Sequence, residues 1–551
     1  MDNPISPMVT RQAMLRRGVA GAIALGAPAI VARPALAAGA GFDEIRHLLS
    51  RTGFGPRPDE ISALEALDYA GAVDRVLGAW RPQAGTPAPA WVGMALAQTR
   101  ARQREFQQRR ETAAAAPKSE PSMADATGAP PARPRGAAME PKPLVNANPI
   151  QEQGRELRNW WVEEMLATDQ PLVERMVLFW HGHFTSALQK VRFAPAMFHQ
   201  NALFRRHALG NFGALLRDVA RDPAMLVYLD NAQNRASQPN ENFARELLEL
   251  FTLGEGHYAE SDIKAAARAF TGWSIDRDSG AYRFYPAAHD SGPKTLLGQT
   301  GDLDGGDVVD ILLRQPRTAE LIVGKLWREF VSLKPDGAEI ARLATAFRAA
   351  NYEIRPLLKA LLSSATFRDA ASRGGLIKSP VELIVGTVRV LGLPVPEKTR
   401  LVRAMQSLGQ VPFEPPNVKG WAGGEAWITT STLLMRQQIM RRIIEASTVA
   451  MADGAGTGMM ARPGRRMDRR EQMAGDDATM QLPPDDSTPV EGRSLRDAGM
   501  SARVGGALAG LDAGMLTRTL VPVVPRVPPT AGASAGRIVA ALLLDPVFQL
   551  K

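Results

Sequence analysis

Two histidines, His181 and His183, flank a single glycine in the stretch VLFWHGHFTSALQKVR (177–192), in a chain that holds only 7 histidines. On an α-helix, residues two positions apart point about 200° away from each other, so the pair could not bind one ion together. In an extended segment they share a face. Because Gly182 lets the backbone leave a helix that we expect to end near Trp180, the spacing predicts two ligands for zinc, manganese or iron. The alternative is that both imidazoles form only structural hydrogen bonds at a helix end.

A second polar group lies in PNENFARELLELFTLG (239–254). Asn240 is a favourable N-cap and Gly254 a favourable stop, so we expect a regular helix between them. Three polar side chains, four and three residues apart, would share one face of that helix and converge: Asn242, Glu246 and Glu249. The predicted ligands of one divalent metal are His181, His183 and Glu246, with Glu249, Asp230 and Asn242 as further candidates.

A metal ion in such a site would lower the pKa of a bound water and polarise an ester or carbonyl group, which predicts hydrolysis. Glu246 or Glu249 would act as the general base, and Arg245 or Arg268 would stabilise an anion. The candidate catalytic residues are therefore Glu246, Glu249 and Arg245. The alternative is an ordinary salt-bridge ladder, because Glu241, Arg245 and Glu249 follow one another at intervals of four residues.

Two tryptophans and several polar loop residues are candidate substrate contacts. The stretch FEPPNVKGWAGGEAWITTSTLLMR (413–436) is not expected to be helical until about Thr430, because its prolines and glycines favour a rigid loop. Tryptophans on such a loop form a stacking platform for sugars or a lid over a site, or they fill the core beneath it. The candidate substrate-binding residues are Asp230, Asn234, Asn242, His257, Trp421 and Trp427.

The acidic stretch GDLDGGD (301–307) resembles half of a calcium-binding loop. It lacks the bidentate glutamate that completes such a loop. We therefore interpret it as a turn.

Helical periodicity dominates the sequence. The stretch SPVELIVGTVRVLGL (379–393), for example, has a serine cap, a proline in the first turn and a glycine stop. No convincing run of alternating strand residues is present. The predicted fold class is mainly α, a multi-helical globular domain with long ordered polar loops and two low-complexity insertions.

Shifts in composition predict six segments along the chain. They are an export signal (1–37), an N-terminal helical part (42–110), an Ala/Pro-rich linker or insertion (111–146), the main helical domain with the candidate site (147–450), a disordered insertion (451–500) and a C-terminal helical segment that packs on the main domain (501–551).

The N-terminus is typical of an export signal. MLRRGVAGAIALGAPAIVA (14–32) has a charged start and about 15 apolar or small residues, too few to span a bilayer comfortably. The small-residue site at 35–37 predicts cleavage before Ala38. The pair Arg16 and Arg17 favours the twin-arginine route, and an ordinary secretory signal is the alternative. We expect a periplasmic or extracellular protein without a transmembrane anchor in the mature chain.

Composition excludes several classes of site and partner. The chain has no cysteine, so it has no disulfide and no thiolate ligand. Its net charge of +9 comes partly from the export signal, and no basic stripe is interleaved with aromatics. We therefore expect no nucleic-acid partner.

Several long motifs resemble one bacterial family. HLLSRTGFGPRPDEI, LFWHGHFTS, ARAFTGW, HDSGPKTLLGQTG, KSPVEL and PPNVKGWAGGEAWITT, together with the stretch RRHALGNFGALL to LGEGHY, are similar to the domain of unknown function 1800 family. The resemblance runs from about residue 42 to the C-terminus, apart from the two insertions. It implies an exported, largely helical protein whose gene neighbour is a sulfatase-like protein of the domain of unknown function 1501 family. No activity is established for the family, so it assigns no catalytic residue.

Two functions follow as hypotheses, and whether the protein is an enzyme stays open. The first is a metal-dependent hydrolase of the periplasm or cell surface with one divalent ion. The second is a non-catalytic partner or scaffold of the sulfatase-like protein.

Overall fold

The computed structural model describes residues 40–78, 80–115, 148–394, 397–452, 508 and 510–551. Helices predominate in these residues, and the strands form two short antiparallel hairpins. The predicted mainly α fold class is therefore confirmed. The export signal, most of the Ala/Pro-rich segment and most of the insertion predicted at 451–500 lie outside the described residues.

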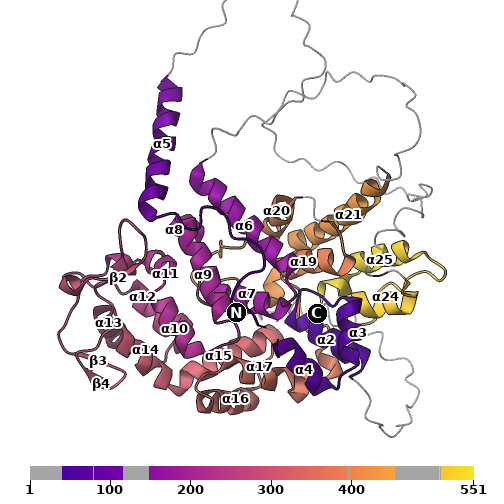
Figure 1. Cartoon of the computed structure of the whole chain (residues 1–551). Helices are drawn as coiled ribbons and strands as arrows, with labels where there is room; N and C mark the ends of the chain where they lie inside the picture. The colour runs from indigo at the N-terminus through magenta and orange to yellow at the C-terminus, as the bar shows by residue number, and fades with distance from the viewer. Residues whose placement is uncertain (1–39, 79, 116–147, 395–396, 453–507, 509) are drawn as a thin grey trace, which may run out of the picture.

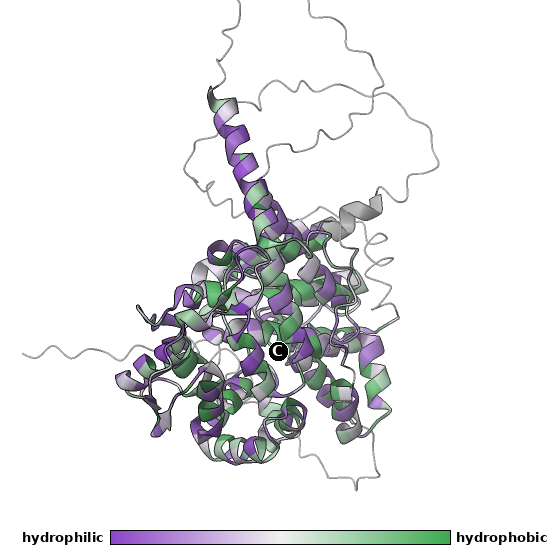
Figure 2. Ribbon diagram, turned by 60° about the vertical axis from the view of Figure 1, so that its left-hand side comes forward, coloured by the Kyte–Doolittle hydropathy of each residue, from purple (hydrophilic) through white to green (hydrophobic). Residues whose placement is uncertain are grey.

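The N-terminal part is a small group of helices and one long arm. Its helices are α2 (Phe42–Thr52), α3 (Pro58–Glu65), α4 (Tyr69–Gly78) and α5 (Leu96–Ala115). Helix α5 extends away from the body of the molecule (Figure 1). Most of its residues beyond Arg100 are exposed, and Figure 2 shows hydrophilic residues along the protruding helix. It reaches Ala115, so the start of the segment predicted as a linker is helical.

The centre of the molecule is a bundle built around α7. The first helices of this part are α6 (Pro149–Ala167), α7 (Pro171–His183), α8 (Leu188–Val191), α9 (Ala194–Arg206), α10 (Phe212–Ala220) and α11 (Pro223–Tyr228). Nearly every side chain of α7 is buried. Pro171 occupies the first turn, where its missing N–H costs no hydrogen bond.

A second part, at the left of Figure 1, carries both hairpins. It comprises the 3-10 helix η2 (Asn231–Gln233), α12 (Asn242–Glu246), the π-helix η3 (Leu247–Thr252), α13 (Glu260–Ala269), β1 (Trp273–Ile275), β2 (Tyr282–Phe284), η4 (Pro286–Ala288), β3 (Lys294–Leu296), β4 (Gln299–Gly301) and α14 (Gly305–Arg314). Strand β1 pairs with β2, and β3 with β4.

The remaining helices close the body on the other side. They are α15 (Pro316–Phe330), α16 (Gly337–Ala349), α17 (Ile354–Leu362), α18 (Ala365–Arg368), η5 (Ala370–Ser372), α19 (Pro380–Leu391), α20 (Lys398–Ser407), η6 (Gly424–Trp427), α21 (Thr430–Ala452), α24 (Ala513–Leu520), α25 (Ala535–Leu544) and η7 (Pro546–Gln549).

One apolar core joins the first and last described segments. It runs from Ala40 to Phe548, and α24 approaches α2 through an ion pair between Arg518 and Asp43. At the end of the chain, the backbones of Leu376 and Lys551 exchange two hydrogen bonds. The C-terminal segment thereby brings Lys551 beside the start of α19.

Helix α19 crosses the chain at the turn after α2, and a glycine makes the crossing possible. A Cβ at Gly386, in the middle of α19, would overlap the carbonyl oxygen of Phe54. The backbone carbonyl cannot swing aside as a flexible side chain could, so this position has room only for hydrogen.

We predict that Gly386→Ala lowers the free energy of unfolding by about 1–3 kcal/mol, the usual cost of overpacking. The matched control is Gly324→Ala in the middle of α15, where no atom lies near the added methyl group. The control should be neutral or stabilising by up to about 1 kcal/mol, because alanine favours a helix. Denaturant titrations of both variants test this, and equal stabilities would contradict the crossing.

Candidate functional site

Both histidines of the opening motif lie in the last turn of α7. The expectation that the helix ends near Trp180 is wrong, because α7 continues through Gly182 to His183. The amide of Phe184 still donates to the carbonyl of Trp180, at 2.7 Å. Since the backbone stays helical, the two imidazoles point to different sides of the helix.

His181 is a buried structural residue. Its Nε2 accepts a hydrogen bond from the backbone N–H of Phe413, at 3.2 Å. Its ring packs edge-on against Trp161. Burial lowers the pKa of His181 to about 3, so the imidazole is neutral. His181 thereby fixes the start of the loop 413–429, which carries Trp421 and Trp427 and is called the tryptophan loop below.

His183 faces a lysine instead. The ammonium of Lys325, on α15, donates to Nδ1 of His183 at 2.9 Å and to the carbonyl of Leu250 at 2.8 Å. Burial, together with the charge of Lys325, holds the pKa of His183 well below its usual value. Burial also lowers the pKa of Lys325 to about 8, so the lysine stays mostly charged at neutral pH.

The glycine between the histidines is where the tryptophan loop touches α7. A Cβ at Gly420 would overlap the carbonyl oxygen of Gly182, and Gly420 has a φ of 75°. The ring of Trp421 lies 3.8 Å from the position that a Cβ on Gly182 would take. Two glycines thus let the loop and the helix meet backbone to backbone.

The helix expected between Asn240 and Gly254 is not regular. It changes after Glu246 into the π-helical turn η3, which shifts the direction of the side chains that follow. Glu249 accepts a hydrogen bond from the hydroxyl of Tyr258, at 2.6 Å. Burial, and next the neighbouring Glu249, raise the pKa of Glu246. Both carboxylates lie within the electrostatic reach of Lys419 on the tryptophan loop.

Arg245 forms a salt-bridge ladder, but with a different last member. Its guanidinium pairs with Glu241 at 3.1 Å and with Glu260 of α13. Glu249, which the spacing placed in the ladder, bonds elsewhere. Arg245 therefore joins α12 to α13.

The polar loop residues mainly support one another. Asn234 is buried, donates to the carbonyl of Ala267 at 2.8 Å and accepts from the N–H of Asn240 at 2.8 Å. Asp230 has a left-handed backbone with φ of 61°, and pairs with Lys190 at 2.8 Å. Asn242 donates to Asp230 at 3.3 Å. His257 is exposed.

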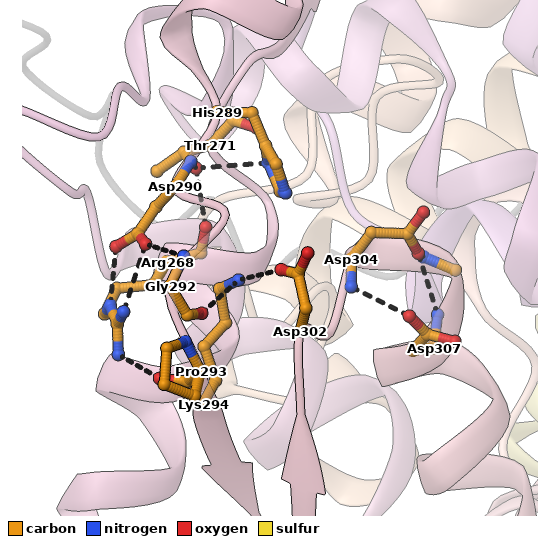
Figure 3. Close-up of polar contacts among 11 residues, drawn as sticks. Arg268, Thr271, His289, Asp290, Gly292, Pro293, Lys294, Asp302, Asp304 and Asp307 are labelled. Atoms are coloured by element: carbon orange, nitrogen blue, oxygen red, sulfur yellow. Dashed lines mark hydrogen bonds and ion pairs between the residues drawn. The ribbon is translucent and has the colours of Figure 1, made fainter.

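The polar residues that precede β3 and those that follow β4 bind each other rather than a free ligand (Figure 3). Arg268, expected to stabilise an anion, makes a two-point ion pair with Asp290 at 2.6 and 3.0 Å. Asp304 is the N-cap of α14 in a reciprocal pair with Asp307, so the acidic stretch predicted as a turn forms the capped start of a helix instead.

These contacts do not fit a shared metal ion. Nε2 of His181 and Nδ1 of His183 already accept hydrogen bonds, so the other nitrogen of each neutral ring carries the proton. Across the residues that the structure describes, no three histidine, aspartate or glutamate side chains are arranged to hold a metal. The metal site with His181, His183 and Glu246 stays a prediction, without support from this geometry.

A cleft of about 240 Å³ opens beside the end of α7 instead. Its walls come from α7, α15, the segment before α19, the tryptophan loop and the end of the chain. The lining side chains with charge or an indole are Arg175, Lys325, Arg328, Glu329, Glu382, Lys419, Trp421, Trp427 and Lys551, and His183 lies at the inner end of α7.

The charges in this cleft do not balance. Arg175 pairs with Glu382 at 2.7 Å and with Glu329, and Lys551 pairs with Glu382. Lys325 and Arg328 form no ion pair with any described residue, and the indole Nε1 of Trp421 is buried without a hydrogen bond there. The cleft therefore offers unpaired positive charge.

The sequence pointed to Trp421 and Trp427 but not to the cations beside them. Lys325 sits within the amphipathic stretch of α15, between apolar residues that are buried. A lysine in such a stretch is a weak signal, because lysines often extend to solvent from these positions. Glu246 and Glu249 lie near Lys419 rather than with the histidines.

No helix of the described residues is long and apolar enough to cross a membrane.

Comparison with known proteins identifies a family but no individual relative. Neither the curated proteins nor the solved structures contain a match. The family model described as "Protein of unknown function (DUF1800)" matches residues 47–550, nearly the whole chain, and the protein therefore belongs to this uncharacterised family.

Proposed function

We propose that the protein binds an anionic ligand in the cleft, through a carboxylate, sulfate or phosphate group. The observation that carries the proposal is the pair Lys325 and Arg328, two cations that line one cleft without an ion-pair partner among the described residues. Arg328 is exposed and can reach a ligand, while Lys325 is held in place by two hydrogen bonds. Oxyanions are the ligands that such paired donors favour.

The tryptophans indicate what the uncharged part of the ligand would be. Trp421 and Trp427 are both half-buried on a loop that Gly420 and His181 fix to α7. A fixed indole gives a sugar or aromatic ring a surface to stack on. The ligand class that fits is an anionic sugar, such as a sulfated or uronic sugar. The export signal predicted from the sequence, and the sulfatase-like neighbour implied by the family resemblance, would fit the same choice.

The test is calorimetric titration with galacturonate, glucose 6-sulfate and glucose 6-phosphate, with glucose as the neutral comparison. We predict that at least one anionic sugar binds and that Arg328→Gln and Lys325→Met each weaken it about 10-fold or more, the value of a charged hydrogen bond. Lys264→Met, an exposed lysine outside the cleft, is the matched control and should bind as the unchanged protein does.

Thermal unfolding of each variant separates lost binding from lost folding. Lys325→Met leaves the carbonyl of Leu250 without its donor, so some destabilisation is expected. Arg328→Gln removes an exposed side chain whose one hydrogen bond, to the carbonyl of Ala422 at 3.5 Å, is long, so it should change the melting temperature little. Binding of glucose as tight as that of the charged sugars would refute the proposal.

Ligand affinity should also depend on pH. The charged form of Lys325 binds the anion, and its pKa in the free protein is about 8. Affinity should therefore be full below pH 7 and fall as the pH rises through 8, with the ligand raising this pKa in the complex. In Lys325→Met the decline near pH 8 should disappear. An unchanged pH profile in that variant would assign the titration to another group.

The metal-dependent hydrolase and the non-catalytic partner remain alternatives with their own measurements. Elemental analysis of the protein and of His183→Gln tests the first: we expect no metal that depends on His183, because its Nδ1 accepts from Lys325. If the unchanged protein carries one equivalent of zinc, manganese or iron and the variant carries none, the result would support the hydrolase hypothesis. Co-purification with the sulfatase-like protein tests the second and is compatible with ligand binding.

A further inference from the structure

A second concentration of positive charge lies behind the cleft, inside the protein. It consists of six basic side chains, five of them buried and Lys378 half-buried: Arg46, Arg51, Arg175, Lys378, Arg436 and Lys551. They come from α2, α7, α21, the segment before α19 and the end of the chain. The carboxylates that pair with members of this basic cluster are Glu382 and Glu329.

Both carboxylates pair with Arg175, and Glu382 also pairs with Lys551. Burial alone would raise the pKa of Glu382, but Arg175 and Lys551 hold it below its usual range. Glu382 is therefore ionised and its charge is already shared between two cations.

The other four members have no carboxylate partner among the described residues, and they rely on neutral acceptors. Arg51 donates to three backbone carbonyls, those of Phe330, Val331 and Ser372. Arg436 donates to Oε1 of Gln549 and to a carbonyl, each at 3.0 Å.

Lys378 and Arg46 form no ion pair with a described residue, although the charge of Asp43 acts against the effect of burial on the pKa of Arg46, and that of Glu382 does so for Lys378. Lys378 donates to the carbonyl of Phe548 at 2.8 Å and lies 3.9 Å from the centre of its ring. Nη2 of Arg46 is buried without a hydrogen bond. Burial lowers the pKa of Lys378 to about 7 and that of Arg46 to about 10. Whenever these groups are charged, burial without a counter-ion is unfavourable.

A small cavity lies between these two cations. It has a volume of about 20 Å³ and is lined by Arg46, Lys378 and Lys551, with apolar walls from Leu520 and Leu550. That volume accommodates one ion or water molecule and is too small for a carboxylate or sulfate group. Glu382 also lines it, but its charge is bound by Arg175 and Lys551.

We propose that this cavity binds one chloride ion, held by Arg46, Lys378 and Lys551. A water molecule would satisfy the hydrogen bonds but would leave the excess positive charge uncompensated. The chloride site is distinct from the ligand cleft and does not depend on the proposed function, although Glu382 and Lys551 form part of the wall of both.

The first test exchanges the anion and needs no variant. Thermal unfolding is followed as sodium chloride replaces sodium gluconate at constant ionic strength. A site that binds only the folded state raises the melting temperature with chloride, here by about 2–5 °C between trace and 200 mM chloride. Bromide should act in the same way, and its anomalous scattering should give one peak between Arg46 and Lys378 in a crystal. No chloride-dependent shift, or a bromide peak only elsewhere, would overturn the proposal.

Variants locate the effect. Lys378→Met and Arg46→Gln should each abolish most of the chloride-dependent shift. In gluconate, Arg46→Gln should change the melting temperature little, whereas Lys378→Met leaves the carbonyl of Phe548 without its donor and should lower the melting temperature. The cleft variant Arg328→Gln and the surface variant Lys264→Met should keep the full shift. If Arg328→Gln loses it and Lys378→Met keeps it, chloride binds in the cleft and the cavity is not the site.

Discussion

The compensation of buried positive charge by Glu382 is the interaction on which the C-terminal half of the structure depends. This carboxylate stands in the first turn of α19, where it also accepts from the backbone N–H of Ser379 at 2.8 Å. Through Arg175 it holds α7, and through Lys551 it holds the last residue of the described chain. Loss of one partner from such a network leaves a charge buried and unpaired, which is far more costly than the net value of the pair. Arg175, Glu382 and Lys551 also form part of the wall of the ligand cleft.

Each residue of the motif His-Gly-His contacts a different neighbouring segment. His181 binds the backbone before the tryptophan loop, Gly182 gives the loop room to approach, and His183 accepts from Lys325. Burial keeps both imidazoles neutral, so each can accept a hydrogen bond without adding charge, and His183 accepts its bond from a cation of the cleft. The motif thus positions the binding surface, while the charge comes from α15.

Local signals in the sequence were sufficient for most helix starts but not for the site. Proline at the first turn of α7 and the serine cap of α19 act within a few residues, and both helices begin where these signals predict. The contact of His183 with Lys325 joins residues 142 positions apart, so no spacing within the motif could indicate it. The π-helical turn was missed because its apolar residues repeat as in an α-helix. That turn rotates Glu249 toward Tyr258, away from the face on which the metal hypothesis relied.

Helix α5 stands apart from these networks, and its polar surface has a consequence for how the protein tolerates change. A helix that buries little apolar surface gains its order mostly from its own backbone and side chains, and it lacks the packing of an apolar face that stabilises most helices in proteins. Its unfolding need not be coupled to that of the core. Selection on the stability of the body therefore acts weakly on the outer turns of α5, and its length and composition can drift while the cleft and the charged interior stay fixed.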